Sequence, residues 1–293
     1  MHRFYAPGFA SDGVVDLPED EAEHLSRVLR LKAGDAIAIF DGQGREALAR
    51  VSSVTSRRVS VHVVELPEDE AQHLSRVLRL KAGDAIAIFD GQGREALARV
   101  SSVTSRRVSV HVVEPRAAAP EARVAVTLAQ ALLKSDKMDR VIRDAVMLGV
   151  AAVQPFVSRR TDVPMRAFTT GGRQDRWDRT VISSVKQCGR AVVPPVYETK
   201  EFGAVLQSSA GQTRLMFVEP GASQHVADMT SVEGQRPSSA IVLVGPEGGW
   251  DPQEVADAAA AGVTLLSFGG RVLRADAAAA AVIPVLRYIW RDL

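Results

Sequence analysis

The N-terminal part of the chain alternates short apolar runs with polar turns. In residues 57–64, valines alternate with serine and histidine, which is the period of a strand with one buried face and one wet face. Residues 19–31 instead carry apolar side chains at helical spacing. The pattern predicts one helix and three strands, at 19–31, 36–40, 46–51 and 57–64.

This pattern occurs twice. Residues 17–65 (copy one) and 66–114 (copy two) are the same segment, except that Glu23 in copy one is Gln72 in copy two. A helix with several short strands suggests a small β-barrel, and two further strands are expected before copy one, at 3–6 and 14–17. One barrel requires one copy only. We therefore expect two related barrel units in tandem, with at least one lacking strands and open at an edge.

The pattern of apolar and polar positions changes after residues 115–120, which have the composition of a linker. Apolar strands then alternate with helical stretches, which is typical of an α/β domain with a mostly parallel sheet covered on both faces. Gly149 and Gly262 stand where glycine ends a helix. Strands are predicted at 124–128, 150–156, 214–219, 240–244 and 263–268. Helices are predicted at 136–148, 174–188, 252–261 and 276–290.

The most informative segment is the Gly-Pro-Glu-Gly-Gly turn at residues 245–249, which follows a predicted strand. A helix start comes directly after it: Asp251 can be the N-cap, Pro252 suits the first position and Glu254 completes a capping box. Glycines ahead of a helix let the backbone approach a ligand and offer its N–H groups.

A second glycine-rich loop, at residues 267–276, follows the next predicted strand. The carboxyl ends of parallel strands meet at one edge of the sheet, and ligands bind beyond that edge. The two loops therefore predict one ligand pocket.

Composition narrows the class of protein. The 293 residues suffice for two domains and a sizeable core. No apolar stretch reaches about 18 residues and the first residues do not resemble a signal peptide, so we expect a cytoplasmic protein that does not enter the membrane. Cys188 is the only cysteine, which excludes an internal disulfide and a cysteine-based zinc site. No metal is expected.

The net charge is only +1, but the charges are unevenly distributed. Residues 116–200 contain fifteen Lys and Arg against eight Asp and Glu, an excess of seven. Such an excess favours a polyanionic partner. The alternative is a solvated helix face.

Taken together, several motifs carry a family resemblance. The strongest signal is the Gly-Pro-Glu-Gly-Gly turn followed by Gly-Arg-Val-Leu-Arg at 270–274, in this order and spacing. Weaker matches lie at 3–5, 24–30, 34–35, 40–42, 130–138, 148–150, 159, 187–190 and 194. With these motifs the chain resembles the ribosomal RNA small subunit methyltransferase E family, within the SPOUT methyltransferases. The resemblance covers nearly the whole chain, apart from one repeat copy.

The resemblance implies a domain organisation and an activity. It implies a PUA-like RNA-binding β-barrel region over 1–116, which here contains the repeat, and a SPOUT methyltransferase domain with a trefoil knot over 121–293. It also implies S-adenosylmethionine as cofactor, a homodimer, and methylation of a uridine N3 in the 16S ribosomal RNA of the small subunit.

The chain departs from the family pattern in places. Asp144 and Met147 stand where the family has Lys and Glu, and Trp250 replaces a common Phe. A usual Thr-Glu-Thr-Ala is replaced by Ala275, Asp276, Ala277 and Ala278.

Methyl transfer to N3 requires a positioned donor and a nucleophile whose proton is lost or weakened. Arg190 and Arg274 are the candidates for stabilising negative charge on the base, and Glu247 for taking the proton or orienting the base. The alternatives are an ion pair that serves the structure for Arg190, and a turn-stabilising role for Glu247. The candidates for binding the cofactor are Val244, Gly245, Pro246, Glu247, Gly248, Gly249, Phe268, Gly269, Arg271, Val272 and Leu273.

Basic residues in both halves are candidates for RNA contacts, since contacts with phosphate provide affinity without reading sequence. Each one taken singly can also be a solvated charge. The candidates are Arg27, Arg30 and Lys32 in copy one, Arg76, Arg79 and Lys81 in copy two, and Lys134 and Arg159.

Three other functions compete with this one. One is a SPOUT enzyme for another RNA position, such as a ribose 2′-hydroxyl. Another is an RNA-binding relative that has lost turnover, which the departures from the family pattern would explain. A dinucleotide-dependent dehydrogenase is disfavoured because no Gly-x-Gly-x-x-Gly follows a strand with an acidic residue about 20 positions later.

Overall fold

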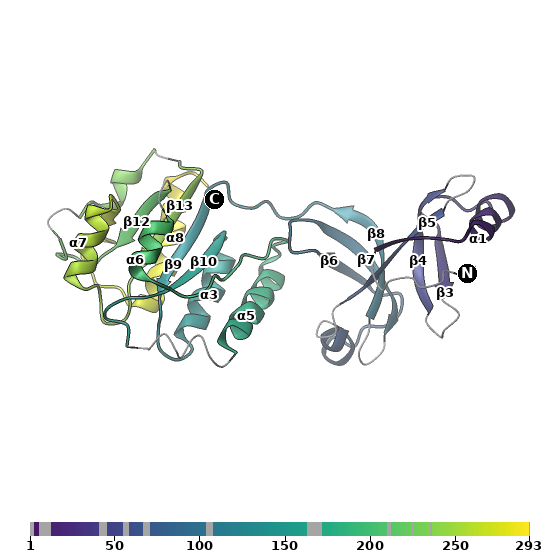
Figure 1. The fold of residues 1–293 in the computed structure, drawn as a ribbon, viewed down its shortest axis with the longest axis horizontal. Helices are drawn as coiled ribbons and strands as arrows, with labels where there is room; N and C mark the ends of the chain where they lie inside the picture. The colour runs from purple at the N-terminus through teal and green to yellow at the C-terminus, as the bar shows by residue number, and fades with distance from the viewer. Residues whose placement is uncertain are drawn as a thin grey trace. The chain divides into compact units, whose positions relative to one another are not determined.

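The chain folds into two compact units, Met1–Ala118 and Ala119–Leu293 (Figure 1). The structure is a computed structural model. It describes residues 3–5, 13–40, 46–54, 59–66, 71–103, 108–162, 172–209, 212–223, 226–234 and 236–292.

In the N-terminal unit, each copy of the repeat forms three antiparallel strands in chain order. Strand β5 of copy one then pairs with β8 of copy two, so that both copies share one sheet. Copy one contributes β3 (Ala36–Phe40), β4 (Glu46–Val54) and β5 (Val59–Glu65). Copy two contributes β6 (Ala85–Phe89), β7 (Glu95–Val103) and β8 (Val108–Arg116).

The N-terminal strands complete copy one only. Strand β1 (Arg3–Tyr5) pairs in parallel with β3, and β2 (Gly13–Asp16) pairs antiparallel with β5. Within the described ranges, β6 of copy two pairs with β7 alone. In the described residues, copy two lacks the strands that complete copy one and has an open edge at β6, as expected. The two copies share one sheet, and the closure of either copy into a barrel stays a prediction.

The predicted helix over 19–31 is helical as far as residue 28, but its second half is π-helical and it ends three residues early. Helix α1 (Glu19–Glu23) widens into a π-helical turn, η1 (His24–Val28), and copy two has the same turn, η2 (His73–Val77). The turn is closed by the Leu29 N–H, which donates to the His24 carbonyl at 3.1 Å. Arg30 then adopts a left-handed φ of 53°, which ends the helix. Because both copies show this geometry, it follows from the local sequence.

Identical isoleucines are buried differently in the two copies. Ile37 and Ile39 of β3 are fully buried in the core of copy one. Their counterparts Ile86 and Ile88 of β6 are only partly buried. Since the surrounding repeat sequence is the same, the neighbouring strands must cause the difference.

This difference predicts unequal costs for one substitution made in each copy. We expect Ile39→Ala to lower the free energy of unfolding of the N-terminal unit by about 2–4 kcal/mol, because it leaves a cavity in a closed core. The matched Ile88→Ala should cost clearly less, because part of that side chain already meets solvent. Calorimetric unfolding of both variants measures the two costs, and equal costs would show that the copies are equally closed.

The C-terminal unit contains a six-stranded sheet in which every pair of neighbouring strands is parallel. The predicted parallel α/β sheet is confirmed. Its order is β11-β10-β9-β13-β12-β14, so that β13 lies between β9 and β12. The strands are β9 (Ala125–Ala131), β10 (Ala152–Val157), β11 (Lys200–Glu201), β12 (Thr213–Phe217), β13 (Ser239–Val244) and β14 (Thr264–Leu266).

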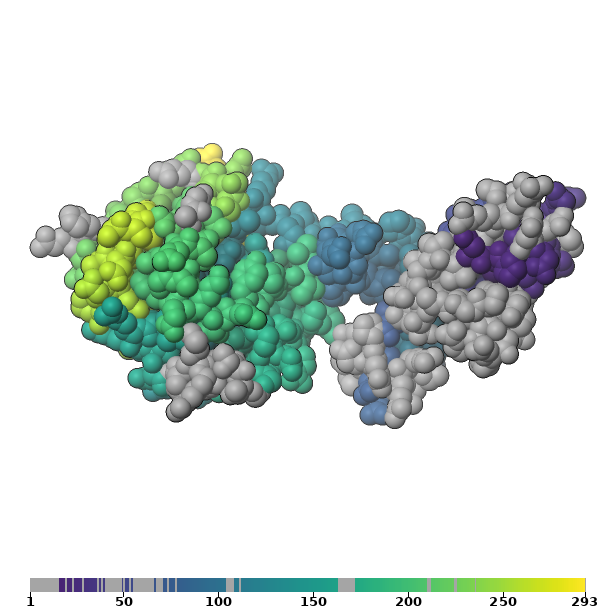
Figure 2. Space-filling view, viewed as in Figure 1, coloured from purple at the N-terminus to yellow at the C-terminus, as the bar shows by residue number. Residues whose placement is uncertain are grey.

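Helices cover both faces of this sheet, as predicted. Two of them, α6 and α7, enclose a core cluster against one face, and α7 lies at the surface of the unit in Figure 2. On the opposite side α8 packs on α3, which in turn packs on α5 (Figure 1). The helices are α3 (Lys137–Met147), α5 (Arg173–Cys188), α6 (Phe202–Ser208), α7 (Pro252–Ala260) and α8 (Ala275–Ile289). The short elements α6, β11 and η3 (Met229–Val232) were not predicted.

A buried ion pair ties the end of α8 to the beginning of the sheet. Arg287 donates to Asp292 at 2.8 Å and to the Leu148 carbonyl at 2.9 Å. Asp292 accepts from the backbone N–H groups of Arg123 and Val124, which lead into β9. Burial lowers the pKa of Arg287, and the neighbouring Asp292 opposes that shift. The ends of α8 and α3 are thereby fixed on the sheet.

Candidate active site

A cavity of about 350 Å³ lies at the carboxyl edge of the parallel sheet. Its wall comes from the ends of β12 and β13, the loop after β14, and the first turn of α8, with one residue, Lys137, from α3. The two glycine-rich loops therefore meet at one pocket, at the edge where ligands of parallel sheets bind.

The Gly-Pro-Glu-Gly-Gly turn is held by an aromatic anchor. Trp250 stacks on Phe156, with ring centroids 5.9 Å apart and planes 13° from parallel. Its indole N–H donates to the Phe217 carbonyl at 2.7 Å. A Cβ on Gly245 would lie 2.9 Å from the Trp250 ring, so that only glycine fits there.

The start of α7 fixes the other end of the turn. The predicted capping box is confirmed: Asp251 accepts from the Gln253 N–H at 3.0 Å, and Glu254 accepts from the Asp251 N–H at 3.2 Å. Glu254 is buried and also accepts from the Ser158 hydroxyl and the Arg159 N–H, each at 2.9 Å.

The fit at Gly245 can be tested by a single methyl group. Gly245→Ala should displace Trp250, at a cost of about 1–3 kcal/mol in the free energy of unfolding, and should weaken ligand binding in the pocket. Thermal unfolding and the near-ultraviolet circular dichroism of Trp250 measure the displacement. The matched control is Gly203→Ala in α6, where an added Cβ meets nothing within 4 Å. A Gly245→Ala protein as stable as the control would contradict this role of the glycine.

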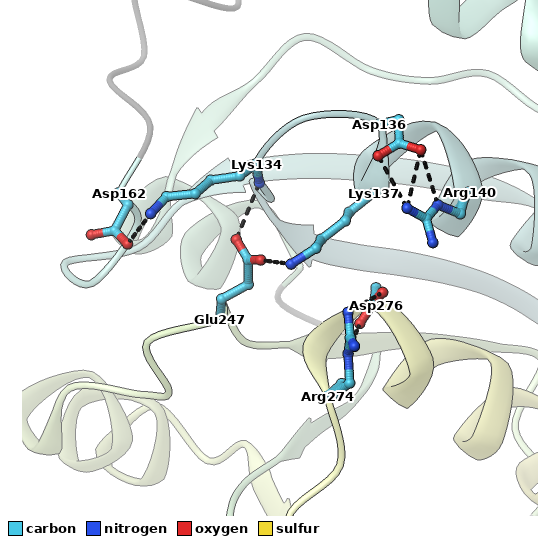
Figure 3. Close-up of polar contacts among 8 residues, drawn as sticks. All are labelled: Lys134, Asp136, Lys137, Arg140, Asp162, Glu247, Arg274 and Asp276. Carbon is cyan, nitrogen blue, oxygen red and sulfur yellow. Dashed lines mark hydrogen bonds and ion pairs between the residues drawn. The ribbon is translucent and has the colours of Figure 1, made fainter.

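Glu247 is tied to the loop before α3 (Figure 3). Its carboxylate forms an ion pair with Lys137 and accepts from the Lys134 N–H at 3.2 Å. Burial raises the pKa of Glu247, but Lys137 and Lys134 more than offset it, so the pKa lies below its ordinary value. An ionised and paired carboxylate is a weak general base, so the structure favours the turn-stabilising role for Glu247.

Arg274 and Asp276 form a second ion pair on the pocket wall, with N–O distances of 3.0 and 3.1 Å (Figure 3). Burial raises the pKa of Asp276, but the pair with Arg274 more than offsets it, and the pKa lies below its ordinary value. The Arg274 side chain is 72% exposed, against 14% for Asp276. The more buried Asp276 carboxylate thus orients the Arg274 guanidinium, which stays accessible to a large ligand.

Arg190 does not line the pocket. Its guanidinium forms an ion pair with Glu121 at 2.5 Å and donates to the carbonyls of Val146 and Val150 at 2.8 and 3.1 Å. It is almost fully buried. These contacts fix the segment that follows α3, so the structure favours the alternative of an ion pair that serves the fold.

Most of the predicted cofactor residues line this one pocket. They are Val244, Gly245, Pro246, Glu247, Gly249, Phe268, Arg271, Val272 and Leu273. Two do not: Gly248, where a Cβ would lie 3.1 Å from the Arg160 carbonyl oxygen, and Gly269, whose φ of +69° serves the turn.

Sequence reasoning missed the third wall of the pocket. It consists of residues 217–220, at the end of β12 and directly after it, together with Lys137 from α3. The apolar run that forms β12 ends at Glu219, and parallel strands end at the same edge, so this segment could have been found. Lys137 carried no such signal, because its place depends on the packing of α3.

The predicted RNA-binding residues lie at the surface. Arg27, Arg30, Lys32, Arg76, Arg79 and Lys81 are exposed at the ends of the π-helical turns. Lys134 and Arg159 are also exposed, and the hydrogen bond that the Lys134 ammonium donates to Asp162 raises the pKa of Lys134. Their contact with RNA stays a prediction. The divergent residues Asp144 and Met147 on α3 do not line the pocket.

Comparison with known proteins identifies the family. A family model described as RNA methyltransferase domain matches residues 120–287, and a model described as RNA methyltransferase PUA domain matches 17–64 and again 66–113. The chain belongs to this RNA methyltransferase family. The two PUA matches coincide with the two repeat copies.

Two similar curated proteins share the name ribosomal RNA small subunit methyltransferase E. The ribosomal RNA small subunit methyltransferase E of Synechocystis is 31% identical over 53% of this chain and 50% of its own length. The chain thus spans about half the length of that curated relative. The protein of the same name from Rickettsia conorii is 27% identical over 96% of this chain and 92% of its own length.

The solved structures agree with this assignment. The ribosomal RNA small subunit methyltransferase E of Neisseria gonorrhoeae, bound to S-adenosyl methionine, is 30% identical and superposes with a TM-score of 0.72 over 78% of this chain and 93% of its own. A probable rRNA-methyltransferase from Porphyromonas gingivalis is 26% identical, with a TM-score of 0.68. The SPOUT-like fold with a PUA-like region is thereby confirmed.

The described residues show neither a metal-binding group nor a membrane-spanning helix. No group of three or more His, Cys, Asp or Glu side chains is placed to hold a metal ion there. None of the helices described is long and apolar enough to cross a membrane.

Proposed function

We propose that this protein methylates N3 of a uridine in the 16S ribosomal RNA of the small subunit, with S-adenosylmethionine as methyl donor. The observation that carries the proposal is the pocket in which both glycine-rich motifs meet, in a chain of the RNA methyltransferase family. The similar Neisseria protein is bound to S-adenosyl methionine.

The pocket fits such a cofactor. Apolar side chains of Phe217, Val244 and Leu273 suit an adenine ring, while Glu219 and Asp276 supply carboxylates for hydroxyl or ammonium groups. Gly249 has a φ of +72°, and an added Cβ would lie 2.7 Å from the Glu219 carboxylate. The backbone thus passes close to the space that a ligand would fill.

When bound, the sulfonium cofactor supplies an electrophilic methyl group. The chain's own residues must position the uracil and weaken its N3–H bond. Arg274 lines the pocket and is held by Asp276. In this proposal it stabilises the negative charge that spreads onto the uracil oxygens as N3 loses its proton. Lys137 and Glu247 hold the turn of the pocket in place.

The binding of RNA and the assembly of the protein belong to the same proposal. The exposed basic residues of the N-terminal unit, with Lys134 and Arg159, contact phosphates. Val272 and Tyr288, which are 72% and 73% exposed, suit an interface with a second copy, so that a homodimer forms through the C-terminal unit. The trefoil knot stays part of this proposal.

The identity of the product tests the proposal. The assay uses labelled S-adenosylmethionine and small ribosomal subunits from cells that lack an enzyme of this kind, followed by mass spectrometry of nucleosides. We expect 3-methyluridine, because N3 is the nucleophile that a stabilised uracil anion presents. A ribose-methylated product would support another SPOUT target, and cofactor binding without any product would support an RNA-binding relative.

Arg274 allows a sharper test. Arg274→Ala should lower kcat by about 10²–10³-fold, the usual effect of removing one donor to a developing anion, with little change in protein stability. Arg274→Lys should recover only part of the rate, because it keeps the charge but not the planar geometry. The matched control is Arg236→Ala, an exposed arginine away from the pocket. A full rate for Arg274→Ala would remove this residue from the mechanism.

A further inference from the structure

Copy two of the repeat presents a strand edge that copy one covers. Strand β3 lies between β1 and β4, whereas β6 pairs only with β7 in the residues that the structure describes. Both strands read Ala-Ile-Ala-Ile-Phe, so their own sequence does not cause the difference. The cause is β1, which the chain has only once.

Copy two leaves more of its apolar side chains accessible to solvent than copy one does. Ile86 and Ile88 are partly buried, although the identical Ile37 and Ile39 are fully buried in copy one. Leu78, which follows the π-helical turn of copy two, is 55% exposed, whereas the equivalent Leu29 packs partly buried against the core of copy one. Apolar surface next to an unpaired edge favours association with another strand.

The edge strand also lacks the features that protect natural edges. Protected edges carry lysine, proline, inward-pointing charges or a bulge. Residues 85–89 contain no charged residue and no proline, and β6 pairs with β7 in regular register along its full length. The register shifts of copy two lie between β7 and β8, one strand further in.

We propose that β6 pairs with β6 of a second copy of this chain, antiparallel about a two-fold axis. Two chains that exchanged their β1 strands would still have open edges. Each chain has only one β1, but it has two strands, β3 and β6, with which β1 could pair. Pairing β6 with β6 closes both open edges at once and leaves β1 on β3. An antiparallel pair of identical strands is self-complementary, as a two-fold interface requires.

This interface is separate from the homodimer proposed for the C-terminal unit, and it does not depend on methyl transfer. If both interfaces form, the chain assembles beyond a dimer. If only β6 pairs, the largest species is a dimer.

A charge on the edge tests the pairing. Ala87 and Ser102 are both exposed, but Ala87 lies on the edge strand β6, whereas Ser102 lies on β7, beyond the end of β6, and pairs with Ser109 of β8. We expect the molar mass of the intact protein and of Ser102→Lys, measured by light scattering, to rise with concentration. Ala87→Lys should lose the β6 association step, so that it stops at a dimer if the C-terminal interface also forms and stays a monomer if it does not. The same mass for all three proteins would overturn the proposal.

Single cysteines test the geometry directly. Cys188 is replaced by serine, and Ala85→Cys or Ala87→Cys is added in separate proteins. Ala87 is the central residue of β6, so a fully overlapped two-fold pair places Ala87 of one chain opposite Ala87 of the other. A disulfide requires Cα atoms within about 7 Å, so Ala87→Cys should form a covalent dimer under mild oxidation, and Ala85→Cys should cross-link less because it lies away from the axis. Ser102→Cys is the control and should not cross-link. No cross-linking of Ala87→Cys, or equal cross-linking at Ser102→Cys, would contradict the fully overlapped β6 pairing.

Discussion

The pocket depends on one buried carboxylate. Glu254 accepts from the Asp251 N–H, the Ser158 hydroxyl and the Arg159 N–H, and it is only 1% exposed. It therefore joins the start of α7 to the segment after β10. Hydrogen bonds to a charged group contribute about 1.5–3 kcal/mol each, and any one left unmade in a buried place carries a large penalty. The glycine-rich turn is held between this junction and the stacked ring of Trp250, so its backbone has little freedom.

The features set by short stretches of sequence were predictable. The capping box after Trp250, the two glycine-rich loops and the parallel sheet all follow from patterns of a few residues. The third wall of the pocket depends on the order of the strands, because β13 inserts between β9 and β12. Local patterns do not specify that order. The contacts of Arg190 were not predictable for a similar reason: its partner Glu121 is distant in sequence and close in the fold.

The repeat separates local from tertiary causes. The π-helical turn appears in both copies, so it is a property of the repeated segment. The burial of the isoleucines differs between the copies, so it is a property of the neighbouring strands. A closed core thus requires N-terminal strands that the duplication did not copy.

The central claim is that the two glycine-rich loops and the end of β12 form the cofactor site. A crystal structure of the protein with S-adenosylmethionine tests it most directly. We expect density for the cofactor between the turn at 245–249 and residues 268–273. A carboxylate of Glu219 or Asp276 should contact the bound cofactor. Density bound elsewhere, or a pocket that stays empty at saturating cofactor, would contradict the assignment.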